Sequence, residues 1–173
     1  MRLRSTLLVA FVALFGLAGQ VSAQKIASID MERILSSITE YQDAQEQLDQ
    51  LTAKWQQEIN QRYDEIKGMY NKLQAEMVLL SADEKKARED AIIAKEKSVR
   101  ELQRSRFGPD GALFQRRQEL VRPIQEAVYE AVESYATTRG YDFIFDRASA
   151  AGIIFANDTY DKTDDILRAL QRK

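Results

Sequence analysis

The feature that most constrains this chain is the stretch from Thr39 to Arg106, which contains no proline and a single glycine. Charged side chains of both signs are dense along it. Because a compact globule needs frequent turns, this composition predicts long helices. The apolar residues of its first part recur mostly in three- and four-residue steps, which is coiled-coil spacing. They form one expected seam: Tyr41, Leu48, Leu51, Trp55, Ile59, Tyr63, Ile66, Tyr70, Leu73, Met77 and Leu80.

A capping-box pattern at Ser81-Ala82-Asp83-Glu84 indicates where this helix stops and a second one starts. The outgoing helix, Thr39 to Leu80, would be about 60 Å long. The returning segment has only a thin apolar stripe through Ile92, Val99 and Leu102. A turn at Ser81 therefore predicts a long helical hairpin. The alternative, a turn at Gly108, would leave one very long helix whose second half nothing covers.

Phe107-Gly108-Pro109-Asp110-Gly111 breaks the helical pattern. We consider Gly68, Gly108 and Pro109 candidate hinges of the hairpin, although Gly68 can equally be a tolerated glycine. From Leu113 to Tyr135 the next helix has a broad apolar face that is typical of a buried helix. Pro123 is expected to kink it.

The two ends of the chain predict a small β-containing body. Lys25–Ile29, Tyr141–Phe145 and Ile153–Ala156 are strand candidates. Asp30 is expected to cap a short helix and Thr163 a final one. The predicted fold is mainly α, with residues 39–111 forming the hairpin and residues 24–38 and 112–173 the body.

Three short strands provide little core for one chain, so we expect the body to associate with other copies through an intermolecular sheet. The residues predicted to form this association body are Ile26, Ile29, Phe143, Phe145, Ile153 and Phe155.

Residues 1–23 are typical of an export signal, with Arg2 and Arg4 before an apolar run and Val21-Ser22-Ala23 as the cleavage site. The run is shorter than the roughly 20 residues that cross a bilayer, which disfavours an uncleaved anchor. Removing both arginines changes the formal net charge from −2 to −4. An acidic chain argues against a nucleic-acid partner bound through phosphates.

The composition also restricts the chemistry. The chain has no His and no Cys, which excludes imidazole bases, thiolate nucleophiles and the usual zinc ligands. A Ser–Lys pair remains formally possible, but nothing places one in a pocket. Asp142 and Asp146 alternate with aromatic residues, as on the outer face of a sheet. We therefore predict no enzymatic activity and no cofactor or metal.

Several segments together resemble the Skp/OmpH family of periplasmic chaperones. Lys25 to Met31 is similar to the family's first strand and short helix. Gly140 to Asp146, followed by Ala156-Asn157 and Tyr160 to Leu167, is similar to its last strands and terminal helix. The resemblance implies a homotrimer in the periplasm, whose hairpins surround a cavity that holds unfolded outer-membrane proteins without ATP. The best-known members are strongly basic, so we assign this acidic chain no lipopolysaccharide or membrane-surface site.

On this hypothesis the candidate client contacts are the aromatic and thioether side chains of the outgoing helix, which suit irregular apolar partners. They are Trp55, Tyr63, Met69, Tyr70 and Met77. The alternative is that they pack inside the hairpin; Met69, one step off the seam, is the best candidate for exposure. A competing function is an adaptor that binds one folded envelope partner. It predicts a second ordered apolar stripe on the outgoing helix, where the sequence indicates one.

Overall fold

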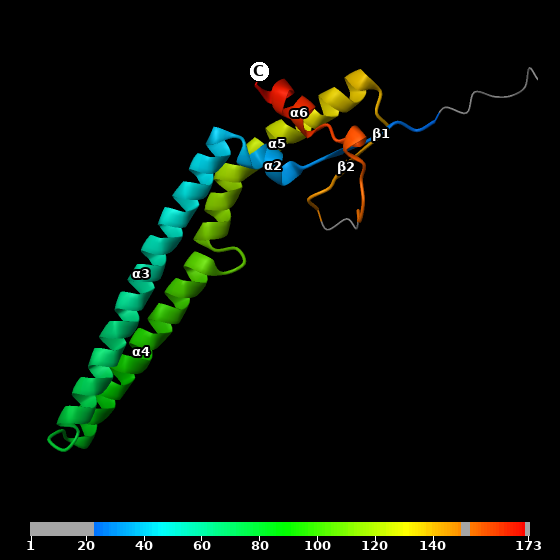
Figure 1. Ribbon diagram of the computed structural model, residues 1–173. Helices are drawn as coiled ribbons and strands as arrows, with labels where there is room; N and C mark the ends of the chain where they lie inside the picture. The colour runs from blue at the N-terminus through cyan, green and yellow to red at the C-terminus, as the bar shows by residue number, and fades with distance from the viewer. Residues whose placement is uncertain (1–22, 150–152, 172–173) are drawn as a thin grey trace, which may run out of the picture.

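The computed structural model describes residues 23–149 and 153–171 (Figure 1). Residues 1–22 of the predicted export signal, which spans residues 1–23, lie outside the described residues. The elements in chain order are β1 (Ile26–Ile29), α2 (Met31–Ser36), α3 (Thr39–Glu76), α4 (Ala82–Phe107), α5 (Ala112–Arg139), β2 (Phe143–Asp146), the 3-10 helix η1 (Asp158–Tyr160) and α6 (Thr163–Leu170). The predicted fold class is confirmed: the chain is mostly helical, with a small sheet and a long projecting hairpin.

The hairpin turns where the sequence predicts. Ser81 is the N-cap of α4, and its hydroxyl accepts a hydrogen bond from the Glu84 backbone N–H at 3.3 Å. The Glu84 carboxylate in turn accepts from the Ser81 backbone N–H at 2.9 Å. Helix α3 ends at Glu76, four residues before the predicted Leu80, so residues 77–80 form the turn. Figure 1 shows α3 and α4 side by side, extending away from the other elements.

An apolar seam joins the two helices of the hairpin. Its buried members come from both helices: Ile59, Ile66, Leu73, Ile92 and Val99. Met69, Leu80, Leu102 and Phe107 pack against them. Met69 was predicted to be the most exposed of the candidate contact residues, and this prediction is wrong. Met69 packs into the seam because its position on α3 faces α4. Tyr70, the next residue, lies at the edge of the seam and is exposed.

The first part of α3 is covered by α5 instead of α4. Ala44 and Leu48 of α3 form a second buried cluster with Val121 of α5. Helix α5 contains Pro123 and changes direction in its middle, as Figure 1 shows. Its first half thus runs along α3, and its second half enters the body. The division of the chain at residue 111 into hairpin and body stays a prediction.

The body contains a parallel two-stranded sheet, in which Ile26 pairs with Phe143 and Ile29 with Asp146. One face of this sheet covers a core of buried residues from β1, α2, α5 and α6: Ile29, Ile34, Leu35, Val128 and Ile166. Asp30 caps α2 as predicted, accepting from the Arg33 backbone N–H at 2.8 Å. Gly140 ends α5 in the left-handed conformation, with φ of 66°.

The predicted third strand, Ile153–Ala156, is wrong. Residues 153–157 form no strand, and the side chain of Phe155 is 83% exposed. The edge of β1 that does not pair with β2 is already occupied by the segment at Asp161 and Lys162. Asp161 forms an isolated bridge with Ser28, and the Lys162 backbone N–H donates to the Ser28 carbonyl at 2.9 Å. An additional strand along that edge would compete with these contacts.

A polar network ties α6 to the start of α2. Helix α6 begins at Thr163 with Lys162 as its N-cap residue, so the predicted capping role of Thr163 is wrong. The buried Thr163 hydroxyl instead accepts from the Asp30 backbone N–H at 2.9 Å and donates to the Asp161 carboxylate at 2.5 Å. Burial alone would raise the pKa of Asp161, but hydrogen bonds from Thr163 and Arg147 hold this pKa below its usual value.

We predict that Tyr135→Phe destabilises the body in a pH-dependent way. The Tyr135 hydroxyl donates to the Asp165 carboxylate at 2.8 Å, and this bond is the main reason that the pKa of Asp165 lies below its usual value. Its removal should lower the free energy of unfolding by about 1 kcal/mol at neutral pH. Because the folded-state pKa is lowered, this stabilisation is present above the usual pKa and is lost as the pH falls through the lowered value.

The measurement is urea unfolding of both proteins at neutral pH and at about pH 2, well below the usual Asp pKa of about 3.9. Protein concentrations must match, because association shifts apparent stability. An equal difference between the two proteins at both pH values would contradict the prediction.

Candidate functional site

One flank of the hairpin exposes a row of large apolar side chains. Tyr63, Tyr70 and Met77 of α3 are 43%, 47% and 47% exposed, and Ile93 of α4 is 57% exposed. The three α3 residues repeat every seven positions, each one position after Arg62, Met69 or Glu76 of the seam side. We call the four exposed residues the arm face.

The two tyrosines of the arm face are held against α4 through their hydroxyl groups. Tyr70 donates to Glu96 at 3.0 Å, and Tyr63 donates to Gln103 at 3.5 Å. The hydrogen bond to the Glu96 carboxylate raises the pKa of the Tyr70 hydroxyl above its usual value. Ile93 lies on the same side of α4, because residues three apart on a helix are neighbours and Glu96 is three positions on. The arrangement fixes the hydroxyl groups and leaves ring surface accessible.

The opposite flank of the hairpin is polar. Glu65 of α3 pairs with Lys95 of α4 at 2.7 Å, and Arg88 of α4 pairs with Glu76. The hydrogen bond from Lys95 lowers the pKa of the Glu65 carboxyl. Exposed pairs of this kind contribute little stability, typically below about 1 kcal/mol. They do make the two flanks chemically different, so that an apolar partner meets only one of them.

The turn of the hairpin extends the apolar surface to its distal end. Val78 and Leu79 are 92% and 85% exposed and follow directly after Met77. A turn that served only to connect two helices would be polar, since exposed apolar runs promote aggregation unless they have a function. Sequence reasoning missed these residues and Ile93. The apolar run Met77-Val78-Leu79-Leu80 just before the capping box was the signal that could have identified exposed apolar side chains at the turn.

Trp55 is not part of the exposed surface. It is 8% exposed. It lies on α3 between the part that packs against α5 and the part that packs against α4. The ring of Phe107 contacts it edge-on at 6.0 Å, and the Arg106 guanidinium lies 4.6 Å from its centroid. This packing makes Trp55 a structural residue of the junction. Of the five predicted contact residues, the structure brings Tyr63, Tyr70 and Met77 together on one surface, and buries Trp55 and partly Met69.

The candidate hinges lie in different surroundings. A Cβ added at Gly68 would meet no atom within 4 Å. One added at Gly108 would lie 2.4 Å from the Arg104 carbonyl oxygen, which accepts a hydrogen bond from the Gly108 N–H at 2.8 Å. Pro109 follows in the same tight connection. The junction at Gly108 thus needs glycine for steric reasons, whereas the position of Gly68 does not. A hinge role for any of them stays a prediction.

We predict opposite effects of alanine at the two glycines. Gly68→Ala should raise the free energy of unfolding by about 0.5–1 kcal/mol, because alanine favours an exposed helix position over glycine. Gly108→Ala should lower it by more than about 1 kcal/mol, because the junction must shift to admit the Cβ. Thermal and urea unfolding measure the change in the free energy of unfolding for both variants. If Gly68→Ala and a rigidified Gly108–Pro109 turn also leave client range and release rate unchanged, the hinge hypothesis is wrong.

The predicted association residues of the sheet are split between its two faces. Ile29 is buried in the core, while Ile26, Phe143 and Phe145 are between 42% and 49% exposed. Phe143 and Phe145 stack with ring centroids 6.1 Å apart. Phe145 borders an apolar groove of about 330 Å³, whose lining also includes Ile26, Ile153, Phe155 and Tyr160. Within the described residues, a continuous apolar surface thus remains open on this face of the body.

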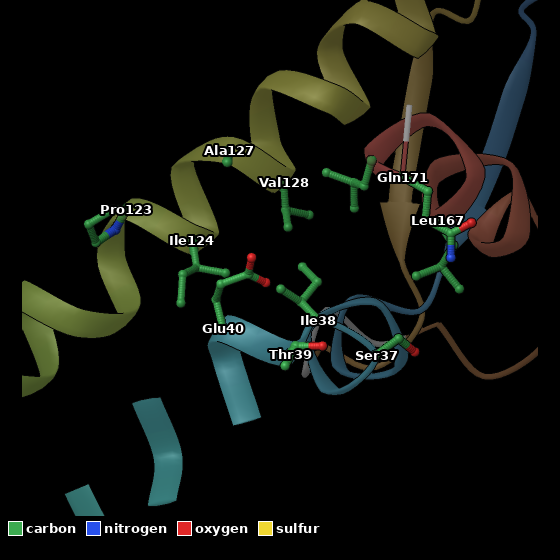
Figure 2. Close-up of a pocket in the computed structure, with 11 residues that line it drawn as sticks. Ser37, Ile38, Thr39, Glu40, Pro123, Ile124, Ala127, Val128, Leu167 and Gln171 are labelled. Atoms are coloured by element: carbon green, nitrogen blue, oxygen red, sulfur yellow. The ribbon is translucent and has the colours of Figure 1, made fainter. Parts of the chain in front are cut away.

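A second groove lies at the root of the hairpin, where α3 leaves the body and α5 bends. Its volume is about 580 Å³, and its lining includes a single carboxylate, that of Glu40. Figure 2 shows Ile38 and Glu40 on one wall, with Ile124 and Val128 of α5 opposite. The groove offers no pair of acid and base. Among the described residues, no cluster of three or more His, Cys, Asp or Glu could hold a metal ion.

The described helices include none that is long and apolar enough to cross a membrane. A long hairpin of mixed charge, apolar on one flank and carried by a small sheet-containing body, defines a binding protein that works through extended surfaces. Residues 25–170 match the protein family described as "Outer membrane protein (OmpH-like)". The chain therefore belongs to this family, which confirms the resemblance predicted from the sequence.

Relatives agree in sequence and in fold. The chain is 28% identical over 159 residues to "Chaperone protein Skp" of Yersinia enterocolitica, covering 89% of this chain and 90% of that protein. The fold matches the crystal structure of a putative OmpH-like outer membrane chaperone from Caulobacter crescentus with a TM-score of 0.68. That alignment covers 87% of this chain and 86% of the other at 13% identity.

Proposed function

We propose that this protein is an ATP-independent holdase of the periplasm, which binds unfolded outer-membrane proteins between helical arms and prevents their aggregation. The single observation that carries the proposal is the arm face, a row of exposed apolar side chains on only one flank of a long hairpin. Membership of the OmpH-like family and the likeness to a chaperone support it. The predicted export signal supports the periplasmic location.

The arm face suits reversible binding of an unfolded chain. Fully burying one large apolar side chain contributes about 1.5–3 kcal/mol, and side chains that are already half-buried have roughly half of this to gain. Several such contacts together compete with aggregation. Each is weak enough to open separately, so a client can leave for a more stable state without nucleotide hydrolysis. No catalytic chemistry is required, in keeping with a family of chaperones.

The arms of a single chain would not enclose a client, and the exposed side of the body supports assembly into a homotrimer. Ile26, Phe143 and Phe145 expose apolar surface at a two-stranded sheet, and β2 pairs only with β1 among the described strands. An unpaired, apolar strand edge favours pairing with another chain. Three such bodies would place three arms around one cavity.

We predict that Tyr63→Ser, Tyr70→Ser and Met77→Ser together weaken client binding without unfolding the arm. The measurement is light scattering of a urea-unfolded outer-membrane β-barrel protein diluted into buffer with the chain from Gln24 to Lys173, counted as trimers. The unaltered chain should suppress aggregation near one trimer per client, without nucleotide. The triple variant should need several-fold more protein, because its contacts lose the apolar surface that they bury.

The matched control carries Gln57→Ser, Asp64→Ser and Asn71→Ser, which have the same seven-residue spacing on exposed positions of the outer side of α3, about 100° around the helix from the arm face. It should suppress aggregation like the unaltered chain. Undiminished aggregation by the unaltered chain at several-fold excess would overturn the proposed function. If the triple variant and its control lose suppression of aggregation equally, clients do not bind specifically at the arm face.

We predict that Phe143→Ser with Phe145→Ser shifts the protein from trimer to monomer. Both side chains lose apolar area that assembly would bury, while the core on the other face of the sheet keeps its contacts. Sedimentation velocity at several concentrations reports the change. The control is Val78→Ser with Leu79→Ser, which removes similar surface at the far end of the arm. A trimer that persists in the double phenylalanine variant would contradict the predicted interface.

A second candidate function is the adaptor that binds one folded envelope partner, and one observation favours it. The sequence pattern predicts a single seam that includes Tyr63, Tyr70 and Met77. In the structure these residues are separate from the buried Ile59, Ile66 and Leu73. An ordered second stripe is what an adaptor predicts. A single stable complex with one folded protein, together with no effect on aggregation, would support the adaptor.

A further inference from the structure

Met77 of the arm face carries the most exposed sulfur among the described residues. Its side chain is 47% exposed and follows directly after Glu76, the last residue of α3. The chain has no Cys and four Met, of which Met1 belongs to the predicted export signal. The other three sulfurs are the thioethers of Met31, Met69 and Met77. An oxidant that attacks sulfur therefore finds no thiol in this chain and reacts with methionine.

Packing shields the two other thioethers. Met31 packs against the core of the body, and Met69 packs into the seam between α3 and α4. Both side chains are half-buried and less exposed than that of Met77. Met69 also borders a groove of about 170 Å³, through which solvent reaches part of it. Because oxidation follows exposure, we expect Met77 to react first.

The surroundings of Met77 give it little cover. Val78 and Leu79, which follow it, are 92% and 85% exposed. Figure 1 shows this turn at the end of the hairpin that is far from the body. A small oxidant in solution thus has access to the sulfur. The predicted export signal would place the chain outside the cytosol, away from the reducing glutathione and thioredoxin systems.

We propose that Met77 is an oxidation site through which peroxide reversibly weakens client binding at the arm face. The sulfur attacks one oxygen of hydrogen peroxide, so that a sulfur–oxygen bond forms and the oxygen–oxygen bond breaks. The second oxygen takes up the proton of the first and leaves as water. The sulfur loses two electrons, which the peroxide gains. An apolar thioether thereby becomes a polar sulfoxide.

The sulfoxide changes the arm face without changing the fold of the arm. Its oxygen accepts hydrogen bonds from water, and burying it against an apolar client without a partner costs free energy. Met77 caps the C-terminal end of α3 and is not a member of the seam, so the contacts between α3 and α4 remain. The inference rests on the proposed function for the location of the binding surface and adds a chemical control of that surface.

The first measurement follows the oxidation of the chain from Gln24 to Lys173 by hydrogen peroxide. Peptide mapping by mass spectrometry at successive times gives the rate at which each methionine gains one oxygen atom. Met77 should react several-fold faster than Met69 and Met31. Oxidation of either of these two residues at the same rate as Met77, or faster, would overturn the inference.

The second measurement compares client binding before and after oxidation of Met77. The probe is a urea-unfolded outer-membrane β-barrel protein with a fluorescent label, diluted into buffer after the peroxide has been removed. Fluorescence anisotropy should give a dissociation constant at least about threefold higher after oxidation, because one side chain loses its apolar contact. The circular dichroism of the chain should not change.

Reduction of the sulfoxide should reverse the effect. Methionine sulfoxide reductases for both epimers, with a dithiol as reductant, return the thioether. The dithiol is oxidised to a disulfide, and the oxygen atom leaves as water. The original dissociation constant should return. An affinity that stays low after mass spectrometry shows the thioether restored would contradict the inference.

Two leucine variants assign the effect to one residue. Met77→Leu keeps an apolar side chain at the arm face but has no sulfur there, and Met69→Leu is the matched control in the seam. Each variant is compared with its own untreated form, so a difference in starting affinity does not matter. Peroxide should weaken client binding by Met69→Leu and leave that of Met77→Leu unchanged. Equal sensitivity of the two variants would overturn the inference.

The two measurements keep this inference separate from the proposed function. If the untreated chain binds clients and selective oxidation of Met77 leaves the affinity unchanged, the holdase stands and the inference is wrong. If the untreated chain binds no client, the proposed function fails, and the control of client binding fails with it.

Discussion

The apolar seam between α3 and α4 is the interaction on which the rest of the molecule depends. Ile92 and Val99 are the only fully buried apolar residues among the described residues of α4, and they meet Ile59, Ile66 and Leu73 of α3. Isolated helices of such polar composition would be marginal in water, so tertiary contact keeps them helical. The capping box at Ser81 sets the register of this contact by fixing where the return helix starts. Arm length, and with it the reach of the binding surface, follows from these few contacts.

The seam and the binding surface are adjacent but separate. Tyr63 and Tyr70 contact α4 through their hydroxyl groups, while the buried aliphatic side chains hold the helices together. The polar flank adds ion pairs that favour α3–α4 pairing in one register but expose no apolar surface. Substitutions on the arm face should therefore alter binding more than folding. This separation lets the seam hold the two helices together while the arm face presents its side chains to a partner.

The main elements and the turn could be predicted from the sequence because local signals agreed with one another at Ser81 and Asp30. Which residues occupy the partly buried positions of the seam could not be predicted from the sequence. Arg62 and Glu76 occupy the partly buried positions that the pattern assigned to Tyr63 and Met77, since long side chains bury their stems while their charged ends reach water or a partner. Hydrophobicity alone does not identify such positions. The third strand failed for a different reason: Asp161 and Lys162 engage the edge of β1, a contact between distant segments that no local pattern reports.

The junction at Trp55 explains why one chain can carry so long an arm on so small a body. Helix α3 has two successive partners, α5 near the body and α4 beyond it, and the chain passes from one to the other through a connection that only glycine fits at position 108. Trp55, with Phe107 and Arg106 against it, fills the space where neither partner helix is continuous. Its large ring spans the change of partner, so that the arm is supported along its length. The body then has only to anchor the first turns of α3 and the second half of α5, and the outer face of its sheet keeps apolar side chains exposed.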